Sequence, residues 1–209
     1  MRFLFDMDSP LMQFISRLCD LVVLNIVFLL TCLPIFTIGA ANTALYDVVF
    51  RMDTEREEKL LRTYFRAFKE NFRQSTAIWL VLLLFGAASC VNMVQFSEIG
   101  GIFGYFLFLI AMLILIVTAM VFGYAFPLLS RFANSTRNML KNALLLGVGS
   151  LPRTVVVTVI NCFPWVLLIV NLYAFVRIGF LWFALYFAAA AYFNSRVLKK
   201  VFDSLEETD

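Results

Sequence analysis

The stretch Ile102–Phe126, IFGYFLFLIAMLILIVTAMVFGYAF, contains no charged residue. A helix needs about 20 predominantly apolar residues to cross the hydrocarbon core of a bilayer. A backbone exposed to lipid must satisfy its own hydrogen bonds, so a run of this length predicts a transmembrane helix. It is too long and too unbroken for the alternating strands of an outer-membrane barrel. The run therefore predicts an all-α membrane protein.

Four further apolar runs accompany this stretch, namely Leu21–Ile38, Thr76–Phe96, Thr154–Tyr173 and Ile178–Asn194. Hydrophobic residues make up 62% of the 209 residues and charged residues 15%. A soluble domain averages about half apolar and about a quarter charged, so the excess apolar surface must face lipid. We therefore expect one membrane domain over residues 1–209, a polytopic transmembrane helical bundle of five spans.

The run Leu21–Ile38 is the least regular of the five, because Asn25, Thr31 and Pro34 interrupt it. Proline cannot donate a backbone hydrogen bond and breaks a regular helix. An alternative is that Pro34 and Gly39 turn the run back as an N-terminal re-entrant hairpin. Four spans then remain, and the N-terminus lies inside.

Cations are distributed unevenly between the connecting segments. They gather between the first and second runs, between the third and fourth, and in the C-terminal tail, whereas the turn 97–101 has Glu98 and no cation. Cationic loops stay on the cytoplasmic side of a membrane. The sequence thus predicts a multi-pass protein of the cell membrane with its large loops and C-terminus in the cytoplasm. With five spans the N-terminus lies outside.

Residues 54–75 are predicted to form an amphipathic interfacial helix on the cytoplasmic side. Thr54 and Glu57 have the spacing of a capping box, and aromatic and basic residues then recur at helical spacing. Rings beside cations suit a helix lying in the lipid headgroup layer. The alternative is a docking surface for a cytoplasmic partner. The residues that we expect to make either contact are Arg62, Phe65, Arg66, Phe68, Lys69, Phe72 and Arg73.

Polar residues within membrane spans are the default functional candidates. In this chain the candidates are Asn25, Asn92 and Asn161. Asparagine in a span more often bonds to a neighbouring helix than to a substrate. No carboxylate lies deep in an uninterrupted span, so we do not expect a proton relay.

The residue types exclude several classes of enzyme. The chain has no histidine, which removes histidine bases, histidine-activated nucleophiles and zinc sites that contain histidine. Cys19, Cys32, Cys90 and Cys162 form no C-x-x-C pair, and no nucleotide-binding loop is present. We therefore expect no enzyme activity, no metal site and no cofactor.

Three segments carry a resemblance to a known family. They are NIVFLLTCLPIFTIGAANTALY (Asn25–Tyr46), FRAFKENFRQSTAIWL (Phe65–Leu80) and KNALLLGVGSLPRTVV (Lys141–Val156). Together they resemble the YesL-like family of bacterial membrane proteins, over nearly the whole chain. The family has no established activity and no assigned functional residues. The resemblance implies a genomic context beside binding-protein-dependent carbohydrate uptake systems and polysaccharide-degrading enzymes in Gram-positive bacteria.

Three functions agree with these observations. The first is an accessory or regulatory component associated with carbohydrate uptake, which would contact the lipid bilayer and subunits of a sugar ABC transporter. The second is a stand-alone small permease with Asn25, Asn92 and Asn161 along its path. The third is a structural membrane scaffold without transport activity. A homo-oligomer is compatible with all three, and no nucleic-acid partner is expected, because the basic and aromatic stripe belongs to a membrane-anchored helix.

Overall fold

The computed structural model describes residues 10–52 and 60–206, and this part of the chain is helical without any strand. The predicted all-α fold is therefore confirmed. The elements are α1 (Pro10–Cys32), η2 (Ile35–Thr37), α2 (Ile38–Arg51), α3 (Leu60–Ile99), α4 (Gly101–Arg131), α5 (Thr136–Gly149), α6 (Leu151–Val170), α7 (Leu172–Arg177), α8 (Gly179–Leu181), the π-helical turn η3 (Trp182–Tyr186) and α9 (Phe187–Glu206).

Four helices in the described residues are long and apolar enough to cross a membrane. They are Met12–Cys32, Leu60–Ile99, Gly101–Arg131 and Leu151–Val170. The length and composition of these four helices confirm the prediction of a helical membrane bundle. The fifth predicted span, 178–194, lies in the C-terminal helix, which passes from α8 through the π-helical turn η3 into α9. That run is helical but not a uniform α-helix.

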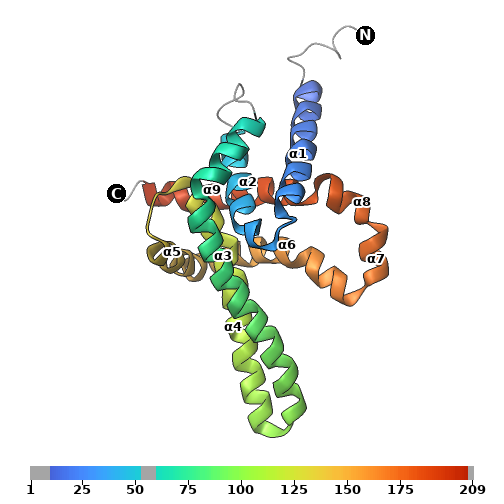
Figure 1. Ribbon diagram of the computed structural model, residues 1–209, viewed down its shortest axis with the longest axis vertical. Helices are drawn as coiled ribbons and strands as arrows, with labels where there is room; N and C mark the ends of the chain where they lie inside the picture. Colours follow the sequence, from blue (N-terminus) through green and yellow to red (C-terminus); the bar gives the residue numbers. More distant parts are fainter. Residues whose placement is uncertain (1–9, 53–59, 207–209) are drawn as a thin grey trace.

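The boundaries of the first predicted span, 21–38, are wrong. Helix α1 begins at Pro10 and ends at Cys32, and the chain then reverses into α2, so that α1 and α2 form a hairpin (Figure 1). The cause is Pro34, whose backbone is extended (φ −76°, ψ 117°) and which has no N–H to continue a helix. The hydroxyl of Thr37 donates to the carbonyl oxygens of Thr31 (2.5 Å) and Pro34 (2.6 Å) and closes the turn.

A second correction concerns the predicted interfacial helix 54–75. Residues 54–59, with the capping-box pattern of Thr54 and Glu57, lie outside the described residues. From Leu60 onward the segment is not a separate helix, because α3 continues without a break to Ile99. No glycine or proline lies between Leu60 and Phe85 to interrupt it. The amphipathic segment is thus the first part of a 40-residue helix.

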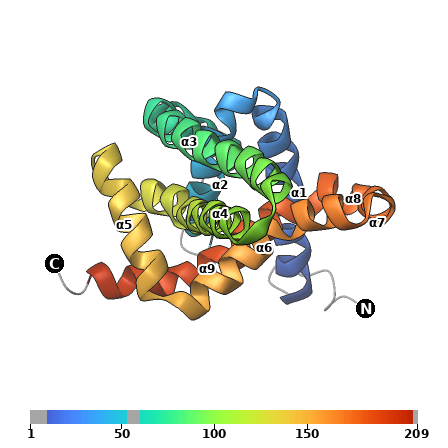
Figure 2. The same ribbon diagram turned by 90° about the horizontal axis from the view of Figure 1, so that it is seen from below.

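Helices α3 and α4 pair along their length as an antiparallel hairpin (Figure 1). Their turn is formed by Gly100 (φ +67°) and Gly101 (φ +64°), which adopt the left-handed conformation that glycine tolerates without strain. The part of this hairpin near the turn projects from the rest of the molecule. A second projection consists of α6, α7 and α8, and Figure 2 shows that it leaves the bundle in another direction.

Helix α2 is the central element of the core, since every residue from Gly39 to Val49 is buried. It packs on α3, α4 and α9. Gly39 permits the closest approach to α3, because a Cβ there would meet the carbonyl oxygen of Ser75 and lie 2.7 Å from the Cβ of Trp79. The core around α2 contains large aromatic side chains such as Tyr64, Phe126 and Phe202.

Candidate functional site

Three amide side chains lie where the C-terminal helix contacts α1, α2 and α6, and two of them, Asn25 and Asn194, are fully buried. These side chains are Asn25 of α1, Asn161 of α6 and Asn194 of α9, with the phenol of Tyr46 from α2. Because the surroundings are apolar, each of their polar groups needs a partner to offset its loss of water. Their hydrogen bonds show which groups are satisfied and which are not.

Asn25 is fully buried and holds the π-helical turn η3 in place. Its Nδ2 donates to the carbonyl oxygens of Trp182 (3.1 Å) and Phe183 (2.7 Å), and its Oδ1 accepts from the backbone N–H of Ala188 (2.9 Å). A π-helical turn shifts the backbone hydrogen bonds of a helix out of their usual register. The amide of Asn25 supplies a donor and an acceptor there, and so joins α1 to the C-terminal helix.

Asn194 joins α2 and α6 from the other side of the C-terminal helix. Its Nδ2 donates to the hydroxyl oxygen of Tyr46 (3.3 Å) and to Oδ1 of Asn161 (3.0 Å). Its own Oδ1 is buried and has no hydrogen-bond partner among the described residues. Helix α2 lies outside the four candidate spans, and burial there raises the pKa of Tyr46 to about 12. The phenol therefore stays neutral and keeps its proton near neutral pH.

A cavity of about 90 Å³ lies beside this group. Its polar lining comes from Asn42, Tyr46, Asn161 and Tyr186. The remaining lining is apolar and mostly aromatic, from Phe28, Ile38, Leu45, Phe122, Trp165, Phe187, Ala190 and Ala191. The cavity thus lies where α1, α2, α4, α6 and the C-terminal helix meet.

Other buried hydroxyl groups of the bundle are bonded to neighbouring helices. Tyr64 shares a hydrogen bond of 2.6 Å with Thr31, and Thr43 shares one of 2.9 Å with Ser75. The hydroxyl of Tyr124 on α4 lies 2.9 Å from the hydroxyl of Ser150, between α5 and α6, and 2.9 Å from that of Thr154 on α6. Within the described residues, two buried side-chain polar atoms have no hydrogen-bond partner, namely Oδ1 of Asn194 and the hydroxyl oxygen of Thr76.

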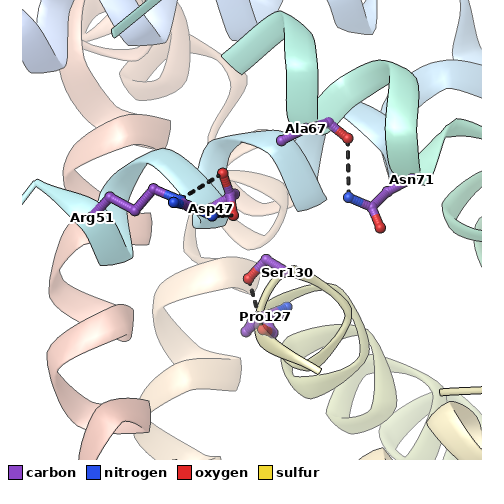
Figure 3. A network of polar contacts seen from close by, with 6 residues as sticks. All are labelled: Asp47, Arg51, Ala67, Asn71, Pro127 and Ser130. Carbon is purple, nitrogen blue, oxygen red and sulfur yellow. Dashed lines mark hydrogen bonds and ion pairs between the residues drawn. The ribbon is translucent and has the colours of Figure 1, made fainter. Parts of the chain in front are cut away.

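A separate polar region lies where the end of α2 meets α3 and α4 (Figure 3). Asp47 accepts from Nε of Arg51 (3.1 Å), one helical turn later on α2. Burial raises the pKa of the Asp47 carboxyl, and the hydrogen bond and charge of Arg51 partly offset this effect. In the same view the amide of Asn71 on α3 donates to the carbonyl of Ala67 (3.0 Å).

Arg131 connects three helices near this region. Both of its Nη atoms donate to Oδ1 of Asp203 on α9 (3.2 Å each), and its guanidinium carbon lies 5.6 Å and 5.9 Å from the ring centroids of Phe50 and Phe202. A guanidinium at such distances is attracted by the aromatic faces. The end of α4 is thereby fixed to α2 and α9.

The predicted docking residues lie on one side of the first part of α3. Arg62, Arg66, Lys69 and Arg73 are exposed, with the half-exposed ring of Phe65 between them. The buried face instead contains Thr63, Tyr64 and Ala67. Phe68 and Phe72 lie between the two faces and contact each other at 5.6 Å between ring centroids. The cations form a continuous exposed stripe, which we call the basic stripe (Arg62, Arg66, Lys69 and Arg73).

The three predicted intramembrane asparagines do not lie together. Asn25 and Asn161 both reach the C-terminal helix, but at Trp182–Ala188 and at Asn194, respectively. Asn92 lies in the last third of α3, half-buried, and no hydrogen bond of its side chain is found within the described part of the chain. Sequence reasoning missed Asn42 and Tyr46, because α2 was not expected as a separate buried helix, and it missed Asn194, because the packing of α9 on α2 and α6 has no local sequence signal.

Residues 21–93 match the model of a family described as "Protein of unknown function, DUF624". The matched segment contains most of α1, all of α2 and most of α3. The chain matches no curated protein and no solved structure. In the described residues no group of three or more cysteine, aspartate or glutamate side chains is placed to hold a metal ion.

Proposed function

We propose that this protein is an accessory or regulatory component of the cell membrane, associated with carbohydrate uptake, and that it belongs to the YesL-like family that it resembles over nearly the whole chain. The match to the DUF624 family over residues 21–93 is consistent with that resemblance. The carbohydrate context comes from the resemblance alone. The structural support comes from α3 and its basic stripe.

The observation that carries the proposal is the continuity of α3. Forty residues at 1.5 Å per residue make a helix about 60 Å long, whereas a bilayer with its headgroups is about 40–45 Å thick. Part of α3 must therefore extend beyond the membrane. The basic stripe lies in the first part of α3, and the same helix continues into an apolar span, so the stripe is rigidly connected to the span. Its positive charges suit contact with an acidic surface of a cytoplasmic partner.

The proposed orientation has the basic stripe in the cytoplasm. Because α1 and α2 run antiparallel, the start of α1 at Pro10 then lies on the same side as the end of α2 at Arg51. Reporter fusions after Arg2 and after Asp209 should be active in the cytoplasm, and a fusion at Glu98 should be active outside. An external signal at Arg2 would return the topology to five spans with an external N-terminus.

The partner that we propose is a subunit of a sugar ABC transporter, recognised through the basic stripe. Crosslinking in intact cells followed by affinity purification should recover transporter subunits with the wild-type protein. The double variant Lys69→Glu/Arg73→Glu should lose this crosslink. The matched control is Lys199→Glu/Lys200→Glu, which makes the same charge change at exposed positions of α9. Equal recovery with both variants, or no transporter subunit with the wild type, would contradict the proposal.

The stand-alone permease is less well supported, because Asn25, Asn92 and Asn161 do not lie along one path. A structural scaffold differs from the accessory component in its effect on transport. Deletion of an accessory component should lower the rate of sugar uptake, whereas deletion of a scaffold should change membrane complexes and leave that rate unaltered. Measuring uptake of a labelled oligosaccharide in deletion and complemented strains separates these two functions.

A further inference from the structure

The cavity between α1, α2, α4, α6 and the C-terminal helix has one polar side and one aromatic side. Asn42 and Tyr46 lie one turn apart on α2 and face it together with Asn161 of α6. Phe122 of α4 and Trp165 of α6 are among the rings that form the rest of its wall. A site of this kind suits a molecule that has both hydroxyl groups and C–H surface.

The hydrogen bonds around the cavity are incomplete. The phenol of Tyr46 accepts from Asn194 and also bonds with the amide of Asn161, and within the described residues no acceptor for its own proton is found. The Oδ1 atom of Asn194, whose side chain bonds to this phenol but does not line the cavity, is a buried acceptor without a donor among the described residues. A buried polar group without a partner costs free energy, so a ligand or water that completes these bonds is favoured. Hydroxyl groups can do so because each is both donor and acceptor.

The lining residues limit the charge of the occupant. No aspartate, glutamate, lysine or arginine side chain lines the cavity. An ion would lose its hydration here without an opposite charge to replace it. Phospholipid headgroups and ammonium-type cations are therefore disfavoured, and an uncharged molecule is favoured.

The volume limits the size of the occupant. An apolar cavity of about 150 Å³ binds benzene, and one water occupies about 30 Å³ of the liquid. The cavity of about 90 Å³ is smaller than the benzene site and larger than one water requires. A compound of about four to six non-hydrogen atoms fits this range, and a hexose does not.

We propose that this cavity binds a small uncharged polyol of the size of glycerol, with Asn42, Tyr46 and Asn161 bonding its hydroxyl groups and the surrounding rings contacting its carbon atoms. This site is independent of the basic stripe and of the proposed transporter partner. Loss of either would leave the other unaffected.

Saturation-transfer difference NMR of the full-length protein in detergent micelles tests the site with glycerol as the probe. We expect saturable binding with a dissociation constant in the millimolar range, as is usual for so small a ligand. Ala190→Leu fills the cavity from α9 and should weaken binding by about tenfold or more. The matched control is Ala77→Leu, at an exposed position of α3, which should bind glycerol as the wild type does.

A second variant covers the case in which Ala190→Leu does not fold. Asn42→Leu keeps the number of non-hydrogen atoms in the side chain but removes its hydrogen bonds, and it should also lose saturable binding. Methylammonium and benzene serve as competing probes. If methylammonium bound more tightly than glycerol, the cavity would be a cation site. If only benzene bound, the cavity would be an apolar void. Either result, or equal glycerol signals from the wild type and Asn42→Leu, would overturn the proposal.

Discussion

Replacing Asn25 with leucine should destabilise the protein more than any other single change to a polar side chain considered above. Leucine has the same number of non-hydrogen side-chain atoms in a similar branched arrangement, so the substitution removes the hydrogen bonds with a moderate gain in volume. It removes the two bonds from Nδ2 to the carbonyls of Trp182 and Phe183 and the bond that Oδ1 accepts from Ala188. The π-helical turn then has no side chain from α1 to satisfy its backbone.

The expected cost follows from these three bonds. A stranded buried N–H at Ala188 costs about 1–3 kcal/mol, and each of the two lost carbonyl contacts costs about 1 kcal/mol. The free energy of unfolding should therefore fall by about 3–5 kcal/mol. Equilibrium unfolding in mixed micelles of dodecyl sulfate and a mild detergent measures this quantity when it is reversible. A spectroscopic signal of the helices follows the transition.

Asn92→Leu is the matched control, because it makes the same chemical change on a candidate span where the side chain has no bond in the described structure. It should alter the free energy of unfolding by less than about 0.5 kcal/mol. If Asn25→Leu were no more destabilising than Asn92→Leu, the amide of Asn25 would not hold the π-helical turn. The role assigned to that side chain would then be wrong.

Three further changes test other contacts. Gly39→Ala should lower the free energy of unfolding by about 1–3 kcal/mol, because the new methyl group meets the backbone of α3, whereas Gly149→Ala in open space should be neutral or slightly stabilising in the same unfolding assay. Arg131→Leu should lower the free energy of unfolding by about 1–2 kcal/mol, because it removes both the ion pair and the aromatic contacts. Asp203→Asn, at a half-exposed side chain, should lower it by less than about 1 kcal/mol. Similar losses for the two variants would argue against the aromatic contacts of the arginine. The raised pKa of Asp47 means that the folded state keeps this proton to higher pH than the unfolded state, so its contribution to stability falls as pH rises above the ordinary value of 3.8. Melting temperatures of the wild type and Asp47→Asn between pH 4 and about 7 should differ in slope with that sign, and parallel curves would contradict it.

The sequence predicted the helical class and most of the spans because long uncharged runs have only one stable conformation in lipid. The runs Thr76–Phe96 and Ile102–Phe126 lie within α3 and α4. The first run was harder, because Pro34 lies in its second half and the composition on both sides is apolar. Hydropathy cannot distinguish one interrupted span from the two helices of a hairpin, and the position of the proline was the only local signal.

The candidate site was only partly predictable. The rule that polar residues in spans are important selected Asn25 and Asn161, which do bond across helices. Asn194 and Tyr46 bond to each other although they are 148 residues apart in the chain. The π-helical turn has no sequence pattern of its own here. Both features depend on how the C-terminal helix packs against α1 and α2, which periodicity within one helix does not specify.

The length of α3 has a mechanical consequence. A rigid rod of about 60 Å that tilts by about 10° moves one end sideways by about 10 Å relative to the other. Transmembrane helices change tilt when the thickness of the bilayer changes. The end of α3 that bears the basic stripe is therefore displaced by a change in lipid composition, even when nothing binds to it. The thickness of the membrane and the position of the basic stripe are linked by this one helix.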